Sequence, residues 1–177
     1  KNFHLLIVDD NSPDGTYKII EKLKLKYKNL YLLKRKKKLG LGSALREGMN
    51  YALKKKYKAL ITIDADLSHN PKEIPLLISK LKSNDFVIGS RYILGGKSDY
   101  TGYRNLISRL ANKLCRFILN MPFNEFTTSF RIYNDKCLKV LKNASLKSDG
   151  YSSQIEFFYY VYRKGLKCKE VPINFKH

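Results

Sequence analysis

Cysteine is scarce in this chain of 177 residues, and long apolar runs are absent. The three cysteines, Cys115, Cys137 and Cys168, are far apart and form no Cys-x-x-Cys pair, which leaves little support for a zinc site or a disulfide framework. A reducing compartment fits this cysteine content best. No apolar run reaches the roughly 18 residues of a membrane-spanning helix, and no signal peptide is evident.

The motifs of several functional classes are also missing. There is no nucleophile elbow, no His-Glu-x-x-His helix and no P-loop lysine motif, so hydrolysis through a covalent triad is not expected. RNA-recognition motifs of the RNP type are absent as well. What remains is a chain with 44% hydrophobic and 12% aromatic residues, which indicates a folded globular protein.

The charge balance is strongly basic, with 35 Lys and Arg against 15 Asp and Glu and a formal net charge of +20. Such a surplus would suit nucleic acid, an anionic membrane surface or a phosphorylated substrate. The lysines are spread along the chain, however, and would equally form an ordinary solvated surface. Charge alone therefore does not choose a partner.

Apolar runs alternate with amphipathic segments along the chain. We expect strands at 3–10, 29–35, 58–66, 85–92 and 167–175. We expect helices at 16–28, 42–56, 71–82, 102–120, 134–142 and 151–164. Continuous apolar strands alternating with helices are typical of a parallel sheet covered on both faces. Residues 1–177 should form one α/β domain, truncated at both ends.

Charged residues follow three of these strands at the ends where ligands bind in such sheets. Asp9 and Asp10 end the first strand, Asp64 and Asp66 end the third, and Arg91 follows the fourth. Two carboxylates spaced Asp-x-Asp on a strand-to-loop turn can share a divalent cation, because Mg²⁺ and Mn²⁺ prefer oxygen ligands. The sequence therefore predicts a metal-dependent site at this edge of the sheet.

Each signal also has a plainer structural interpretation. Asp66 or Ser68 could simply cap the next helix. His69 is more typical of a residue beside a helix start than of a catalytic base. The two glycines of "KKLGLGSA" (37–44) could present amides to a phosphate or form a tight turn. Asp9 and Asp10 should not share one role, since adjacent strand residues point to opposite faces.

The helix at 102–120 has one apolar stripe, made of Leu106, Leu110, Leu114, Phe117 and Ile118. Arginines and a lysine lie elsewhere on this helix. Such a helix could lie in a membrane interface, or it could pack on the sheet through the same stripe. The sequence leaves both arrangements open.

Seven segments, taken in order, resemble glycosyltransferase family 2. They are "VDDNSPDGT" (8–16), "LGLGSALREGM" (39–49), "DADLSHNP" (64–71), "IGSRY" (88–92), "ISRLAN" (107–112), "TSFRIY" (128–133) and "EVPINF" (170–175). The resemblance implies a Rossmann-like GT-A fold, with a mostly parallel sheet flanked by helices. Within the family, the segments look most like the dolichyl-phosphate mannosyltransferases, which implies inverting transfer of mannose from GDP-mannose to dolichyl phosphate.

The resemblance also implies roles for individual residues. Those matching the nucleotide-sugar site are Ile7, Asp9, Asp64, Ala65, Asp66 and Arg91. Mg²⁺ or Mn²⁺ would be held by Asp66 and Ser68, and catalysis would involve Asp66, Arg91 and Arg104. The acceptor side would include Ser129, Arg131, Gln154 and Glu156.

Some family features are missing from this sequence. The opening strand with its Pro-Thr-Tyr-Asn-Glu motif and the arginine and lysine beyond the last strand are absent. In addition, Glu125-Phe126-Thr127-Thr128 stands where the family has Asp-Leu-Thr-Gly or a similar segment. The acceptor loop is therefore the part that the resemblance describes least.

The partners implied by the resemblance are GDP-mannose, dolichyl phosphate and small membrane-anchoring subunits, without nucleic acid. The location would be the cytosolic face of the endoplasmic reticulum membrane, in the service of protein glycosylation and GPI anchor synthesis. Within the same class, the alternative is transfer of glucose or another sugar to a polyprenyl phosphate. From another class, the alternative is a basic RNA-binding or scaffold module, although the acidic strand ends would repel phosphate in the absence of a metal.

Overall fold

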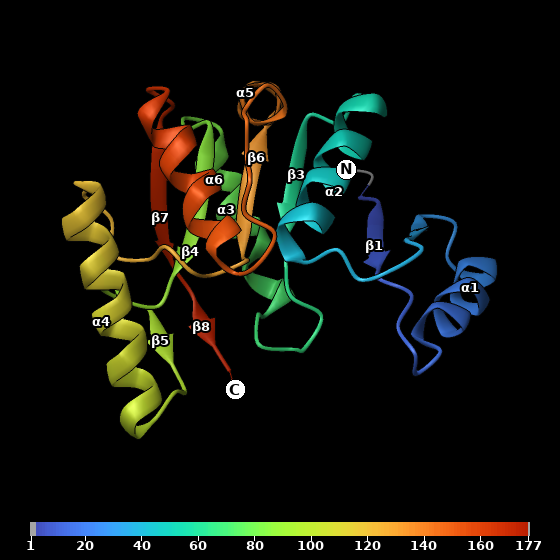
Figure 1. Cartoon of the computed structure of the whole chain (residues 1–177), viewed down its shortest axis with the longest axis horizontal. Coiled ribbons are helices and arrows are strands. Elements are labelled where there is room, and N and C mark those ends of the chain that lie inside the picture. The colour runs from blue at the N-terminus through green and yellow to red at the C-terminus, as the bar shows by residue number, and fades with distance from the viewer. Residues whose placement is uncertain (1–2, 177) are drawn as a thin grey trace.

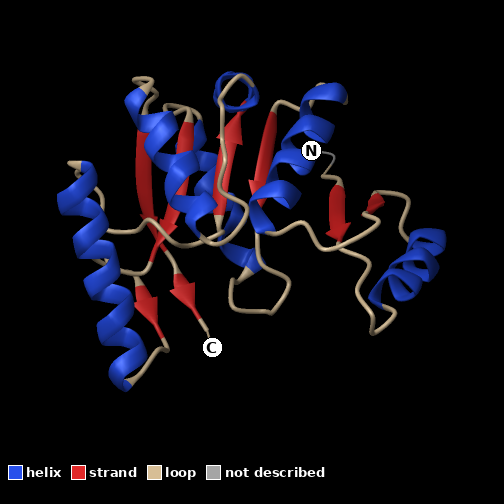
Figure 2. Ribbon diagram, in the orientation of Figure 1, coloured by secondary structure: helices blue, strands red, loops and turns tan. Residues whose placement is uncertain are grey.

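A computed structural model describes residues 3–176 of the chain (Figures 1 and 2). Its strands are β1 (Leu5–Asp9), β2 (Leu30–Lys34), β3 (Ala59–Thr62), β4 (Phe86–Ser90), β5 (Lys97–Ser98), β6 (Arg131–Asn134), β7 (Cys168–Pro172) and β8 (Asn174–Phe175). Its α-helices are α1 (Thr16–Lys26), α2 (Leu41–Lys54), α3 (Ile74–Leu81), α4 (Gly102–Leu119), α5 (Asp135–Lys142) and α6 (Ser152–Arg163). The predicted alternation of strands and helices is confirmed, and β6 adds a strand that was not predicted.

The main sheet has the strand order β3–β6–β4–β7. β4 and β7 are parallel, as predicted, whereas β6 lies between β3 and β4 and runs antiparallel to both. Because of this reversal, the first residue of β6, Arg131, lies opposite Thr62 and Ile88 near the carboxyl ends of β3 and β4. The loop before β6 therefore reaches the same edge of the sheet as the charged strand ends.

β4 shows why this sheet is buried on both faces. All five of its residues are buried, which fits its continuous apolar sequence. Successive side chains point to opposite faces, so Phe86 and Ile88 join one core cluster and Val87 joins the other. Helices α2, α5 and α6 cover the first face, and α3 covers the second through Leu77 (Figure 1).

β1 and β2 form a parallel pair of their own, with Leu5 opposite Leu30 and Asp9 opposite Lys34. Within residues 3–176, no backbone ladder connects this pair to β3. The pair and α1 stand beside the main sheet, in blue in Figure 1. Burial is slight here, since Ile20 is the only described residue of α1 that is buried.

α4 lies on the opposite flank, next to β7 and to the short parallel pair β5–β8 (Figure 1). Among the described residues, no helix is both long and apolar enough to cross a bilayer, and this includes the 18-residue α4.

Candidate active site at the carboxyl edge of the sheet

The loop that follows β3 presents two carboxylates to solvent. Asp66 is exposed, and its Oδ1 accepts a hydrogen bond of 2.9 Å from the backbone N–H of Ser68. Hydrogen bonds from the Ser68 hydroxyl and N–H lower the pKa of Asp66, so this carboxylate is ionised at neutral pH. Asp64 is partly exposed, and its Oδ2 lies 3.7 Å from Nδ1 of His69. Ala65 lies between the two acids and is exposed.

Helix capping does not account for these acids. The residue that caps the next turn is Asn70, whose side chain accepts a hydrogen bond of 3.0 Å from the N–H of Lys72. Ser68 is buried, and its hydroxyl lies 3.5 Å from Nδ1 of His69. Ser68 therefore supports Asp66 within the loop, and its coordination of a metal stays a prediction.

Few protein side chains are available as metal ligands beside Asp64 and Asp66. Among residues 3–176, no group of three or more His, Cys, Asp or Glu side chains is arranged to hold a metal ion. A cation at Asp64 and Asp66 would therefore take its remaining ligands from substrate oxygens and water. Mg²⁺ is commonly bound in this way, through one or two carboxylates and substrate phosphates.

His69 connects this loop to the loop before β6. It is buried, with Nε2 lying 3.0 Å from the hydroxyl oxygen of Thr128 and its ring packed against Phe130 and Phe175. Burial lowers the pKa of His69, and the two nearby carboxylates do not fully offset this effect. A buried, neutral imidazole beside the capping residue Asn70 favours the structural interpretation of His69.

Arg91 follows β4 and is buried against Glu125. Its Nε donates to Oε2 at 2.7 Å, and its Nη2 donates to Oε1 at 2.9 Å and to the hydroxyl of Thr127 at 2.9 Å. Three ring centroids lie 4.9 to 5.8 Å from its Cζ: those of Phe175, Tyr92 and Tyr100. Contact with a diphosphate would require Glu125 to release the guanidinium. The geometry therefore favours a structural role, and the predicted contact stays a prediction.

Glu125 is absent from the residues predicted from sequence. Its carboxylate is fully buried, and Oε1 also accepts hydrogen bonds from the N–H groups of Thr127 and Thr128 at 3.1 and 3.3 Å. The departure from the family segment at 125–128 was the one signal that this loop is unusual. No local pattern, however, connects an acid to an arginine 34 positions earlier.

Three of the residues predicted for the acceptor side lie together: Ser129 in the loop before β6, Arg131 in β6 and Gln154 in α6. The amide of Gln154 donates to the hydroxyl of Ser129 at 3.2 Å, and Gln154 Oε1 is buried without a hydrogen-bond partner in the described structure. Arg131 is fully buried, and its guanidinium donates to the carbonyls of Phe126, Thr128 and Gln154 at 2.6 to 2.7 Å. Arg131 therefore holds the backbone of this loop, and in this arrangement it cannot reach an acceptor phosphate.

Glu156 also binds backbone. Its carboxylate accepts hydrogen bonds of 2.9 Å from the N–H groups of Lys147 and Ser148. Burial raises the pKa of Glu156, but these hydrogen bonds outweigh burial and lower it. The geometry favours a part in holding the loop before α6, and direct contact with an acceptor stays a prediction.

The glycines of "LGLG" serve close packing. The N–H of Gly42 donates to the carbonyl of Asp149 at 2.9 Å, and a Cβ at Gly42 would collide with the carbonyl of Ser148 and with Cβ of Ser153. Gly40 has a positive φ of 86° and lies against the same backbone. Close approach of two chain segments thus explains both glycines without a phosphate.

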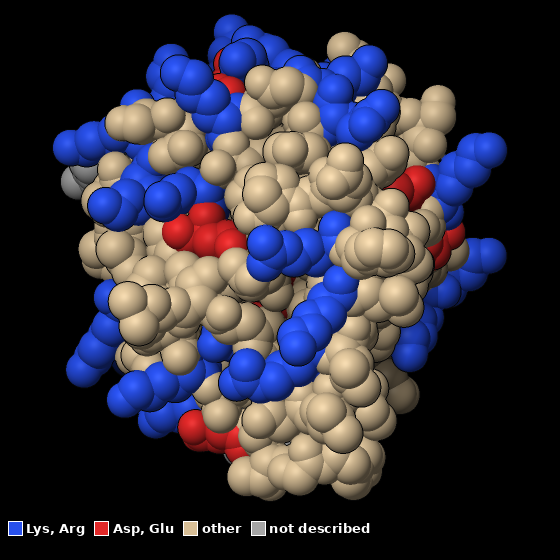
Figure 3. All heavy atoms as spheres, turned by 90° about the vertical axis from the view of Figure 1, so that its left-hand side faces the viewer, with Lys and Arg blue, Asp and Glu red and all other residues tan. Residues whose placement is uncertain are grey.

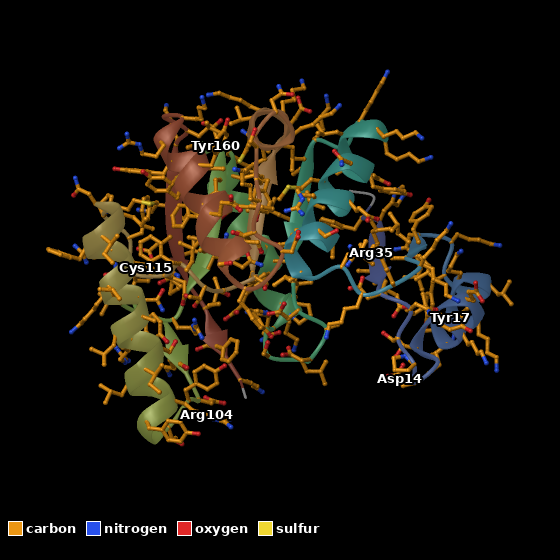
Figure 4. All side chains as sticks on the ribbon, in the orientation of Figure 1. Asp14, Tyr17, Arg35, Arg104, Cys115 and Tyr160 are labelled. Atoms are coloured by element: carbon orange, nitrogen blue, oxygen red, sulfur yellow. The ribbon has the colours of Figure 1, made fainter. Side chains whose placement is uncertain are left out.

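The remaining predicted residues lie to either side of this edge. Asp9 ends β1 and accepts hydrogen bonds from the N–H (3.1 Å) and hydroxyl (2.7 Å) of Ser12, whereas Asp10 pairs with Arg35. The two acids thus have different partners, and their separate roles stay a prediction. Ile7 is half-buried in β1, and Arg104 is exposed near the start of α4, low in Figure 4.

This site sits in a chain whose family can be identified by comparison. Residues 1–141 match the model of Glycosyl transferase family 2. The chain belongs to glycosyl transferase family 2. Membership of this enzyme family contradicts the alternative of an RNA-binding or scaffold module.

Two curated relatives of this family 2 chain are bacterial. Polyprenol monophosphomannose synthase of Mycolicibacterium smegmatis is 35% identical over 175 residues, covering 97% of this chain and 66% of that protein. Undecaprenyl-phosphate mannosyltransferase of Micrococcus luteus is 33% identical, covering 97% of this chain and 71% of that protein. The chain thus spans about two thirds of the length of these relatives.

Solved structures agree on the fold. Glucosyl-3-phosphoglycerate synthase from Mycobacterium tuberculosis, in complex with Mn²⁺, uridine diphosphate and glucosyl-3-phosphoglycerate, superposes with a TM-score of 0.69 at 18% identity, covering 97% of this chain and 59% of that one. At this identity the likeness concerns the fold, and it confirms the predicted GT-A α/β class with its flanking helices. The sheet, predicted to be mostly parallel, is mixed because β6 runs antiparallel to both of its neighbours.

Proposed function

We propose that the chain is the catalytic domain of a polyprenyl-phosphate mannosyltransferase, which transfers mannose from GDP-mannose to the phosphate of dolichyl phosphate with inversion. One observation carries the proposal: two solvent-facing carboxylates, Asp64 and Asp66, end β3 in a family 2 domain of net charge +20. One curated relative is named a polyprenol monophosphomannose synthase and the other an undecaprenyl-phosphate mannosyltransferase, which supports the sugar and the class of acceptor.

Asp64 and Asp66 would hold Mg²⁺ or Mn²⁺ together with the diphosphate of the sugar nucleotide. A divalent cation, when bound, neutralises the diphosphate and helps it to depart. Mn²⁺ is present in the structurally similar synthase, which supports the same choice here. Asp9, at the end of β1, would accept hydrogen bonds from the nucleoside, and Ile7 and Ala65 would line the same site.

The acceptor side needs little proton transfer. A phosphomonoester has a second pKa of about 6, so the nucleophilic oxygen is already ionised at neutral pH. A general base is then not required, which agrees with the buried and neutral state of His69. Ser129 and Gln154, with the unpartnered Oε1 of Gln154, would position the acceptor, and Arg104 would attract its phosphate.

The finer assignments follow the same resemblance. We place the reaction at the cytosolic face of the endoplasmic reticulum membrane, with small anchoring subunits as partners. This location depends on the acceptor lipid. Use of undecaprenyl phosphate, which the name of the Micrococcus luteus relative contains, would instead indicate a bacterial membrane. The two lipids therefore belong in the same assay.

The test is transfer of radiolabelled sugar in detergent, with and without Mn²⁺, comparing GDP-mannose with UDP-glucose and dolichyl with undecaprenyl phosphate. We expect transfer only from GDP-mannose, and better with dolichyl phosphate. Asp66→Asn should lower kcat by at least about 100-fold, because the diphosphate loses its charge stabilisation. The matched control is Asp135→Asn, a partly exposed acid at the start of α5, at the opposite edge of the sheet. Equal activity of Asp66→Asn and the control would contradict the site.

A further inference from the structure

α4 has the reverse of the usual amphipathic arrangement. The side of α4 that contacts the fold is mainly polar: the hydroxyl of Ser108 accepts a hydrogen bond of 2.6 Å from Tyr92, and Asn112 Oδ1 accepts one of 2.7 Å from the N–H of Phe126. Asn112 is the only described residue of α4 that is buried. Cys115 and Leu119 pack against the core cluster from the same side, so these two contacts and the hydrogen bonds hold α4 to the fold without its apolar stripe.

The apolar stripe of α4 faces solvent. At 3.6 residues per turn its members fall within an arc of about 120°. In the structure Tyr103 and Ile107 extend the stripe, and the exposed fractions of its seven members range from 53% to 84%: Tyr103, Leu106, Ile107, Leu110, Leu114, Phe117 and Ile118. Packing of this stripe on the sheet, one of the two arrangements considered from the sequence, is therefore wrong. Contiguous exposed apolar surface of this kind marks a docking site in monomeric proteins.

Basic residues border the stripe, and α4 contains no acidic residue: its charged residues are Arg104, Arg109, Lys113 and Arg116. Figure 3 looks onto this flank and shows largely uncharged surface with many Lys and Arg and few Asp and Glu side chains. Around the end of α4, a shallow recess is lined by the apolar or aromatic side chains of Phe117, Met121 and Tyr162 together with the basic Lys113 and Arg116. A second copy of the chain would bring like charges together here, which is unfavourable.

We propose that α4 is a membrane-docking helix that lies in the interface of an anionic bilayer, with its apolar stripe among the acyl chains and its basic border at the lipid phosphates. Apolar side chains bound to an interface and basic residues attracted to anionic lipid are the two contributions that such helices combine. This inference deepens the proposed function, and rests on it only for the reason why the domain meets a membrane.

The placement of α4 suits a lipid acceptor. The helix starts beside β5, on the side of the molecule toward which the Asp64–Ser68 loop also projects (Figures 1 and 4). Docking through the stripe would therefore bring the carboxyl edge of the sheet close to lipid phosphates while the rest of the fold stays in water.

The test is cosedimentation of the purified chain with vesicles of phosphatidylcholine alone or with about one third phosphatidylglycerol. These vesicles contain neither polyprenyl phosphate nor sugar nucleotide, so the result does not depend on sugar transfer. We expect binding to the anionic vesicles that weakens with added salt. Leu110→Glu/Leu114→Glu should weaken this binding by at least about tenfold.

The matched control is Ile19→Glu/Leu25→Glu, which adds the same charges at exposed apolar positions of α1. It should bind vesicles nearly as the unchanged chain does. Arg109→Gln/Lys113→Gln should weaken binding to anionic vesicles by roughly fivefold per charge and leave binding to neutral ones unchanged. Circular dichroism of each variant checks that the fold is kept.

Three outcomes would overturn the proposal: no vesicle binding by the unchanged chain, equal weakening by the α4 and α1 variants, or an α4 variant that turns a dimer into a monomer while vesicle binding persists. The last outcome would assign the stripe to a second copy. The α4 variant should still transfer sugar to a short-chain, water-soluble acceptor. If the unchanged chain binds vesicles but transfers no sugar, the result would count only against the proposed function.

Discussion

The main sheet and the β1–β2 pair are both made of apolar strands, yet they are held very differently. Every residue of β4 lies buried between two core clusters, whereas β1 is half-buried and starts with an exposed Leu5. α6 buries five residues, but α1 buries only Ile20 among those described. Regions with few buried contacts open at lower free energy than the core does. The β1–β2 pair, which carries Asp9, should therefore open at lower free energy than the main sheet.

Both regions bury charged residues, but they differ in how deeply they bury an ion pair. At the main sheet, Arg91 and Glu125 are both buried. In the β1–β2 region, Arg35 is buried, whereas its partner Asp10 stays partly exposed. A buried charge that loses its partner is costly, so breaking the Arg91–Glu125 pair should cost more than breaking the Arg35–Asp10 pair.

The largest effect is expected at Arg91. Arg91→Met should lower the free energy of unfolding by about 3–5 kcal/mol, because the carboxylate of Glu125 would remain buried without its cation. Urea unfolding measures the loss. Lys139→Met, which removes an exposed ion pair with Asp135 on α5, should cost under about 1 kcal/mol. Similar costs for the two variants would mean that the buried pair is not built as described.

The next effect concerns two glycines of α2. Gly42→Ala should destabilise the protein by about 1–3 kcal/mol, since its Cβ would meet the backbone of Ser148. Gly48→Ala should stabilise it by up to about 1 kcal/mol, because no heavy atom lies within 4 Å of the added Cβ and alanine favours a helix. Thermal unfolding of both variants gives the sign of each change, and the same sign for both would refute the packing account.

Hydrogen exchange compares the two regions directly. Amides of α1 should exchange at least about tenfold faster than those of β4 and β6, a difference of about 1.4 kcal/mol in opening free energy. Mass spectrometry of peptides from 16–26, 86–90 and 131–134 measures it. Equal protection of all three peptides would show that α1 opens only together with the main sheet.

The smallest effect is a pH dependence at Glu156. The pKa of Glu156 is lower in the folded protein than the value of about 4.3 in an unfolded chain. Its stabilisation is therefore complete above that value and is lost as the pH falls through the folded pKa. Between about pH 5 and about pH 3, Glu156→Gln should lose less stability than the unchanged protein. Urea unfolding along a pH series checks this, and parallel curves would contradict it.

The elements of the fold could be predicted because their signals are local. Apolar runs predicted β1 to β4, and helical spacing predicted α2 and α4 to within a few residues. β6 is different: four residues, Arg131–Asn134, follow a loop, and their place between β3 and β4 depends on pairing with strands that lie tens of residues earlier. Nothing in a short window specifies such a partner.

The site could be predicted in part for the same reason. Asp64 and Asp66 follow directly from a strand end, and the structure places them there. The partners of Arg91 and Arg131 could not be predicted, because Glu125 and the carbonyl of Gln154 come from other parts of the chain. The stripe of α4 was visible in the sequence, but its direction depends on what α4 contacts, which only the fold determines.

The divided sheet has a consequence for handling the protein. In the described chain, β1 and β3 each have a ladder on one side only. An unpaired strand edge offers N–H and C=O groups to any extended chain, including another copy. Mutual repulsion of molecules with a net charge of +20 opposes this contact, and salt screens the repulsion. Ionic strength therefore controls the colloidal stability of this protein, which should disperse well in dilute buffer and associate through its open strands in concentrated salt.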